Sequence, residues 1–182
     1  MMLILGFTLA CAPSVVKASV SASTPCDSCG GVCVQDVAAA PSRAHTSSDL
    51  VYTLSPPSGG DHDPCWAAWG VHTDEVRTEN WVHNLEHGGV VVLYGPSVSA
   101  EDVAALTTFV ESRPVGRAIL SPWSAGLDLE GATIAVVAWE HRLLLGCADL
   151  VAIEAFYNEW SGRGPEDVMT DPPSGCMDGD SG

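Results

Sequence analysis

The chain has 182 residues, of which 46% are hydrophobic and 16% are charged, so it is long enough for one domain and apolar enough to enclose a core. Seven Lys and Arg residues stand against 23 Asp and Glu residues, which gives a formal net charge of −16. Because such a surface repels phosphate backbones, we exclude nucleic acid as a partner, whereas the same field attracts cations.

Residues 1–22 are interpreted as an export signal. The stretch MMLILGFTLAC places about nine apolar residues before Cys11, too few to span a bilayer but typical of a signal peptide. TLAC is similar to a lipoprotein box, which makes Cys11 the candidate lipid-bearing residue, and cleavage after Ala22 is the alternative. Either way we expect export to the periplasm or cell envelope, with membrane contact only through an N-terminal lipid if one is present.

Residues 23–48 are rich in Ala, Ser, Val and Pro without a sustained apolar period, and we expect a cysteine-containing linker there. An even number of cysteines remains once Cys11 is set aside, which indicates disulfides in an exported protein. The candidates are Cys26, Cys29, Cys33, Cys65, Cys147 and Cys176. The close spacing in CDSCGGVC would also suit a zinc ion or an iron–sulfur cluster, which stays as the alternative.

Residues 49–167 are expected to form the globular domain, and residues 168–182 an acidic Pro/Gly tail. GVVVLYGP predicts a buried strand that starts at Val90, and AILSP predicts a second, short strand. ATIAVVAWEHRLLLG is apolar on both sides of Glu140-His141, which indicates a hairpin that turns there.

Two amphipathic helices are predicted in the same domain. One covers residues 99–113 with Ser99 as N-cap, and the other covers residues 149–162 with Asp149 as N-cap. The order of elements predicts an α+β fold, a small and mostly antiparallel sheet with two amphipathic helices packed on it and disulfides as staples.

The stretches PPSGGDHDPCWAAWGVH, VHNLEHGGVVVLY, ILSP, AVVAW and GRGPE occur in this order between residues 49 and 167. This order resembles a bacterial and fungal family known as domain of unknown function DUF3105, and VHNLEHGG is its most specific element. The resemblance implies export or membrane attachment and no established activity. It also makes His62, His83, Glu86 and His87 features of the family.

The stretch HNLEH, residues 83–87, has the spacing of a metal-binding motif. Histidines four apart share one face of a helical turn, and HxxEH is a pattern of zinc enzymes in which the Glu is a general base. In a strand, the same two histidines would lie roughly 13 Å apart and could not share an ion. Because Gly88-Gly89 follow at once, we expect at most one helical turn before the strand at Val90.

A metal site needs a third ligand besides His83 and His87. His62 is the first candidate because it lies in a Pro/Gly-rich loop, and His72 is the second, whereas His45 falls in the expected linker. Three imidazoles suit Zn²⁺ or Cu²⁺, with Glu86 as a further ligand, an orienting residue or a base.

Three hypotheses remain open from the sequence. The first is a domain that binds a divalent transition metal, Zn or Cu, through His62, His83 and His87, with Glu86 or His72 as further ligands. The second is a structural or interaction domain whose His/Glu cluster is a satisfied polar network. The third is a metal-dependent hydrolase with Glu86 as its base. Neither an enzymatic activity nor a particular partner follows from the sequence.

Overall fold

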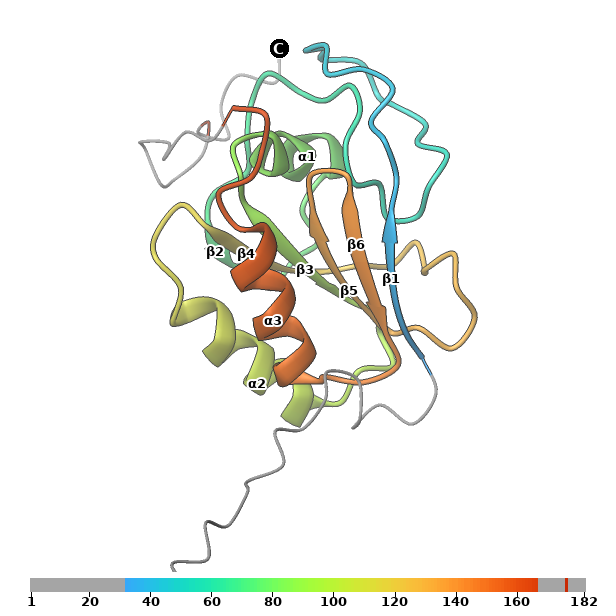
Figure 1. Ribbon diagram of the computed structural model, residues 1–182, viewed down its shortest axis with the longest axis vertical. Helices are drawn as coiled ribbons and strands as arrows, with labels where there is room; N and C mark the ends of the chain where they lie inside the picture. The colour runs from blue at the N-terminus through green and yellow to red at the C-terminus, as the bar shows by residue number, and fades with distance from the viewer. Residues whose placement is uncertain (1–31, 167–175, 177–182) are drawn as a thin grey trace, which may run out of the picture.

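The computed structural model describes residues 32–166 and residue 176 (Figure 1). Six strands and three helices follow one another along the chain: β1 (Cys33–Val37), β2 (Gly70–Val71), α1 (Thr78–Glu86), β3 (Val90–Tyr94), α2 (Ala100–Glu111), β4 (Ala118–Pro122), β5 (Ile134–Ala138), β6 (His141–Leu145) and α3 (Leu150–Trp160). The strands form one sheet in the order β1-β6-β5-β3-β4-β2. Three neighbouring pairs are antiparallel, whereas β3–β4 and β4–β2 are parallel. The predicted α+β fold with a mostly antiparallel sheet is confirmed.

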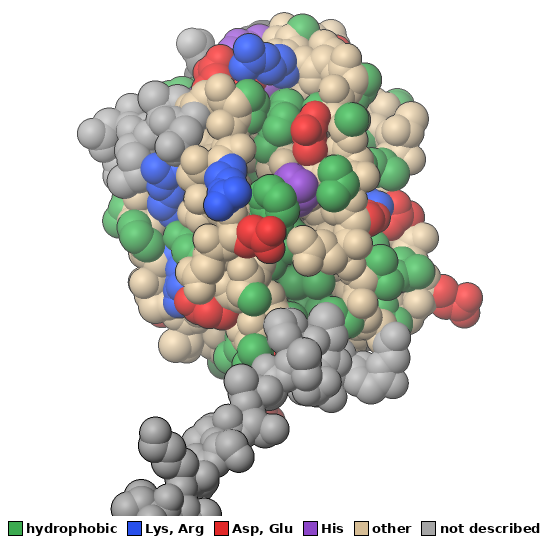
Figure 2. Space-filling model, viewed as in Figure 1, with side chains coloured by type: hydrophobic (Ala, Val, Ile, Leu, Met, Phe, Trp, Pro, Cys, Tyr) green, Lys and Arg blue, Asp and Glu red, His purple; other side chains and the backbone are tan. Residues whose placement is uncertain are grey.

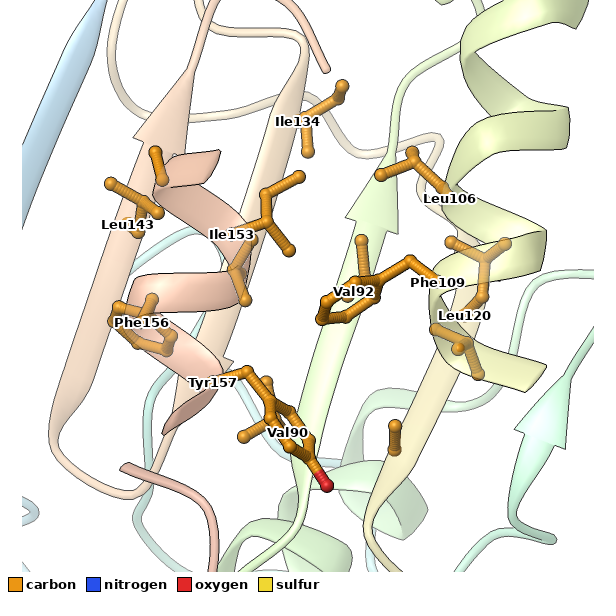
Figure 3. Close-up of a cluster of buried hydrophobic side chains, with 14 of the residues drawn as sticks. Val90, Val92, Leu106, Phe109, Leu120, Ile134, Leu143, Ile153, Phe156 and Tyr157 are labelled. Atoms are coloured by element: carbon orange, nitrogen blue, oxygen red, sulfur yellow. The ribbon is translucent and has the colours of Figure 1, made fainter. Parts of the chain in front are cut away.

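The sheet separates two hydrophobic cores, because successive side chains of a strand point to opposite faces. Val90 and Val92 of β3 face α2 and α3, which lie on one side of the sheet (Figure 1) and contribute residues such as Phe109 and Ile153 to that core (Figure 3). The intervening Val91 belongs to the other core, together with side chains of α1. α1 therefore covers the opposite face of the sheet, where the loops before it also lie.

The two predicted amphipathic helices form with the predicted caps. The Ser99 hydroxyl accepts a hydrogen bond from the Asp102 amide at 3.1 Å at the start of α2. The Asp149 carboxylate accepts from two amides of the first turn of α3, each at 3.0 Å. The hairpin β5–β6 turns at the expected place, with Glu140 at a positive φ of 63°.

Three elements differ from the sequence expectation, and one of them, β2, has no counterpart among the predicted strands. Residues 33–37, expected within the linker, form β1 at the edge of the sheet, where Asp36 accepts hydrogen bonds from Arg142 of β6 at 2.9 and 2.6 Å. A third helix, α1, runs for nine residues instead of the single turn expected before Gly88. Its period is hidden in the sequence because polar side chains, including Glu79 and Asn84, are buried along with the apolar ones.

One of the predicted cysteine staples joins distant parts of the chain. Cys65 and Cys176 form a disulfide across 111 residues of sequence, with Cα atoms 5.2 Å apart. Cys33 and Cys147 are also in the disulfide-bonded form. The expected export signal, with Cys11, lies outside the described residues, as do Cys26, Cys29 and most of the tail. None of the three described helices combines the length and the hydrophobicity that a membrane span requires.

Candidate metal centre

The end of α1 orients the HNLEH side chains. His87 is the C-cap, and Gly88 takes a positive φ of 78°. The Gly88 amide donates to the Leu85 carbonyl and the Gly89 amide donates to the Asn84 carbonyl, at 2.9 and 2.8 Å, which is a Schellman motif. The helix stops there and β3 begins at once. His83 and His87 are one helical turn apart on one face, with ring centroids separated by 4.5 Å.

The loop that carries His62 is fastened to α1 by Asn84. This fully buried amide accepts from the Ala67 N–H at 2.9 Å and donates to the Ala67 carbonyl at 3.0 Å. On its other side the loop pairs with residues 44–46 as an isolated parallel bridge between His45 and His62. The Thr46 amide donates to the His62 carbonyl at 2.8 Å, and the His62 amide donates to the Ala44 carbonyl at 3.1 Å. Three distant segments of the chain thereby meet at the end of α1.

The ring orientation of two histidines follows from backbone contacts. Nδ1 of His62 lies 2.9 Å from the Gly60 carbonyl, and Nδ1 of His83 lies 2.7 Å from the Asp63 carbonyl. A carbonyl only accepts, so both Nδ1 atoms carry the hydrogen. In the neutral rings both Nε2 atoms are then unprotonated. This arrangement, with one nitrogen held by a backbone carbonyl and the other left as a lone pair, is the one that metal-ligating histidines adopt.

Glu86 lies against these rings and is only 1% exposed. Its Oε2 is 2.9 Å from Nε2 of His62 and 3.6 Å from Nε2 of His45. A carboxylate oxygen and an imidazole lone pair repel each other, so a proton or a metal ion must lie between Glu86 and His62. The other carboxylate oxygen, Oε1, is 3.7 Å from the Arg43 guanidinium.

The ligand atoms of His45, His62, His83 and Glu86 all lie within 4.8 Å of one another. Ligands that bind one Zn²⁺ at about 2.0–2.1 Å are at most roughly 4 Å apart, so small side-chain movements bring all four to a common ion. The ring centroids of the three histidines are 4.8 to 4.9 Å apart in each pair. His45 is the most accessible of the four, with 49% of its side chain exposed.

His87 lies beside this group. Its Nε2 is 3.1 Å from Nε2 of His83 and 3.8 Å from Glu166. Since His83 presents a lone pair, His87 must donate through Nε2–H, and its buried Nδ1 has no hydrogen-bond partner among the described residues. The ligand atoms of Glu86, His87 and Glu166 form a second group within the same 4.8 Å limit.

Burial changes the acid–base properties of the two α1 histidines. The pKa of His83 is lowered from its usual 6.5 to about 4, mainly by desolvation. The hydrogen bond to the Asp63 carbonyl opposes the shift, and the neighbouring imidazoles contribute to it. Desolvation also lowers the pKa of His87, against the attraction of Glu86 and Glu166. Both rings are therefore neutral near pH 7, the form in which imidazole binds metals.

The C-terminal segment 162–166 closes the other side of the cluster. The Gly162 amide donates to the Gly88 carbonyl at 2.8 Å, and the Glu166 amide donates to the Glu86 carbonyl at 3.0 Å. Between them, Gly164 packs directly on the end of α1, so that a Cβ atom would overlap the Glu86 carbonyl and the Gly88 amide. The stretches HNLEHGG and GRGPE, separated in sequence, thus form one structural unit.

The structure brings His62, His83 and Glu86 into one group and places His87 next to it. His72, the second candidate for a third ligand, stays apart, with Nε2 bound to the Ala68 carbonyl at 2.8 Å. His45 was not a candidate from the sequence, because it enters the group only through its bridge with His62. No local spacing signals that pairing.

The fold and the cluster define an α+β domain with a buried His/Glu centre at the end of a short helix. The model of one protein family, described as "Protein of unknown function (DUF3105)", matches residues 44–172. The chain therefore belongs to the DUF3105 family, as the resemblance predicted. No curated protein and no solved structure matches the chain.

Proposed function

We propose that the domain binds one divalent transition metal ion, Zn²⁺ or Cu²⁺, through Nε2 of His45, His62 and His83 and the carboxylate of Glu86. The observation that carries the proposal is the pair of backbone anchors. The Gly60 and Asp63 carbonyls hold Nδ1–H of His62 and His83, which leaves both Nε2 atoms as lone pairs. Nε2 of His62 lies 2.9 Å from Glu86, and the ligand atom of His83 lies within 4.8 Å of the ligand atoms of His62 and Glu86. A metal ion is the partner that satisfies two lone pairs and a buried carboxylate at once.

The ligand types narrow the choice of ion. Imidazole nitrogen and carboxylate oxygen suit Zn²⁺, and Cu²⁺ binds such a set more tightly by the Irving–Williams order. Hard cations such as Mg²⁺ and Ca²⁺ prefer oxygen ligands and fit three imidazoles poorly. The net charge of −16 attracts divalent cations of every kind, so the selectivity comes from the imidazoles.

His87 has a different role in this proposal from the one expected from the sequence. If His87 used Nε2 as a ligand, its hydrogen would move to the buried Nδ1, which has no partner among the described residues. When His83 binds the ion, the Nε2–H of His87 instead loses its acceptor and can turn to Glu166, 3.8 Å away. His87 thus donates to His83 in the metal-free cluster and becomes a neighbour of the ion, not a ligand, once His83 binds the ion.

We also propose that the protein works outside the cytoplasm, as the predicted signal before Cys11 suggests. The disulfide between Cys65 and Cys176 supports this, because disulfides persist in oxidising compartments.

With three imidazoles and Glu86 as ligands, four protein groups fill the tetrahedral positions of a zinc ion. This favours metal binding over the hydrolase hypothesis, which needs an open position and a free Glu86.

Equilibrium dialysis of metal-free protein against Zn²⁺ or Cu²⁺, read out by elemental analysis, tests the proposal. We expect one ion per chain and at least about tenfold weaker binding by His45→Ala, because mutation of residues that only support the ligands already costs typically about 10–100-fold in metal affinity. His45 is half exposed, so its removal leaves the core intact. His72→Ala is the matched control and keeps wild-type affinity. If the wild type binds no ion, or both variants bind alike, the cluster is instead a polar network that ties loops to α1.

A further inference from the structure

A cavity of about 520 Å³ opens directly beside the His/Glu cluster. Its walls come from the segment before His45, from the turn of the β5–β6 hairpin and from the GRGPE stretch. Two of its residues also touch the candidate metal centre. Arg43 lies 3.7 Å from Glu86, and the Trp139 ring meets the His62 ring edge-on with centroids 6.2 Å apart. Figure 2 shows basic, acidic and histidine side chains together at the end of the molecule where α1 lies.

The backbone holds the walls of this cavity in place. The Ala40 amide donates to the Glu140 carboxylate at 2.9 Å, which fastens one wall to the hairpin turn. The Ala44 amide donates to Asp61 at 2.9 Å, and this bond holds the segment that carries Arg43. On the opposite wall, Arg163 and Pro165 flank Gly164, which packs on α1. The two guanidinium groups are thereby presented from separate, anchored segments.

The two arginines of the cavity are less engaged than others in the described chain. Arg77, Arg113 and Arg142 each hold a carboxylate oxygen at 2.9 Å or less. The contacts of Arg43 with Glu86 and Glu166 are both 3.7 Å long, and half of its side chain is exposed. Arg163 lies over the Trp160 ring at 5.7 Å and forms no ion pair within residues 32–166. In a chain with only seven Lys and Arg residues, two guanidinium groups with spare donors line one cavity.

We propose that this cavity binds a small organic carboxylate, paired with Arg43 and Arg163 and packed through its apolar part against Trp139 and Pro165. Guanidinium N–H groups match the two oxygens of a carboxylate, and an aromatic side chain beside them accepts an apolar body. A singly charged anion fits better than a phosphate dianion, because Glu86 and Glu166 lie 3.7 Å from Arg43 and Glu140 lines the same cavity. The proposal does not require a metal ion in the neighbouring cluster.

Benzoate is a suitable probe, with benzamide as its uncharged analogue and inorganic phosphate as the competing oxyanion. Binding to the full metal-free protein is measured by chemical-shift perturbation of the tryptophan indole N–H signals and by calorimetry. We expect saturable benzoate binding and none for benzamide. Because a hydrogen bond to a charged group is lost, Arg163→Gln and Arg43→Gln should each weaken binding at least about tenfold. Arg113→Gln, which lies on α2, is the matched control and keeps wild-type affinity.

Three outcomes would overturn the proposal: no saturable binding, equal binding of benzamide, or wild-type affinity in the Arg163→Gln variant. Tighter binding of phosphate than of benzoate would overturn the carboxylate assignment. The measurement is repeated on zinc-treated protein. If benzoate binds but zinc does not, the cavity proposal stands and the metal proposal fails. If zinc binds but benzoate does not, the metal proposal stands and the cavity proposal fails. The two failures are therefore distinguishable.

Discussion

Gly164 and Glu86 are in direct contact, although 78 residues separate them in sequence. The α-carbon of Gly164 faces the Glu86 carbonyl so closely that a side chain has no room, and the Glu166 amide donates to that same carbonyl. A backbone contact of this kind sets where Glu86 stands relative to the cluster. The GRGPE stretch therefore acts on the centre through α1.

Gly164→Ala should lower the stability of the domain and weaken metal binding, although Gly164 is not itself a proposed ligand. The added methyl group forces segment 162–166 away from α1, and overpacking of this kind costs typically about 1–3 kcal/mol of the free energy of unfolding. Urea denaturation measures this loss, and metal dialysis should show weaker binding. Gly95→Ala is the control, because its Cβ would meet only the Thr133 carbonyl at 3.4 Å. Equal stability of the two variants would contradict the prediction.

The stability of the metal-free protein should rise with pH between about 4 and 6.5. Desolvation lowers the pKa of folded His83 to about 4, whereas the unfolded histidine titrates near 6.5. Between these values the unfolded chain binds a proton that the folded chain does not, so stability is full above pH 6.5 and is lost on acidification. Urea denaturation at several pH values should give a shallower rise for His83→Gln than for the wild type. Identical pH profiles would contradict this assignment.

Much of the centre follows from the sequence, and the reasons for the rest are physical. If the segment is helical, the spacing of His83 and His87 puts both rings on one face, and Gly88-Gly89 indicate that the helix ends there, so local rules suffice for both. His45 joins the cluster through a bridge to His62, and β1 joins the sheet through Asp36 and Arg142, which are 106 residues apart. Long-range pairings of this kind leave no local period in the sequence.

Removal of the Cys65–Cys176 disulfide should lower stability by about 2–4 kcal/mol, because the bridge restricts the unfolded chain. Cys176→Ser tests this in a thermal melt and leaves Cys65 in the loop near His62. A melt that the substitution does not change would contradict the predicted stabilisation by the disulfide.

Thiol labelling of the denatured, unreduced wild-type protein should find none of the six cysteines after Cys11 free. Three or more labelled cysteines would favour a thiolate metal site over disulfides.

The N-terminus should carry a lipid on Cys11. The apolar stretch before this residue and the lipoprotein-like TLAC lead us to expect a mature protein that is attached to the membrane by its first residue. In a bacterial host, Cys11→Ser should move the protein from the membrane fraction to the soluble extracytoplasmic fraction. Wild-type protein that is already soluble, with an N-terminus near Ser23, would show cleavage after Ala22 instead.

X-ray absorption at the zinc edge of zinc-loaded protein tests the metal centre most directly, because it reports the ligands themselves. The proposed set of His45, His62, His83 and Glu86 predicts four nitrogen or oxygen neighbours at about 2.0–2.1 Å, with the outer-shell scattering of three imidazole rings. His45→Ala should reduce the imidazole contribution, and His72→Ala should leave the spectrum unchanged. Sulfur neighbours at about 2.3 Å, or a spectrum without imidazole scattering, would contradict the account.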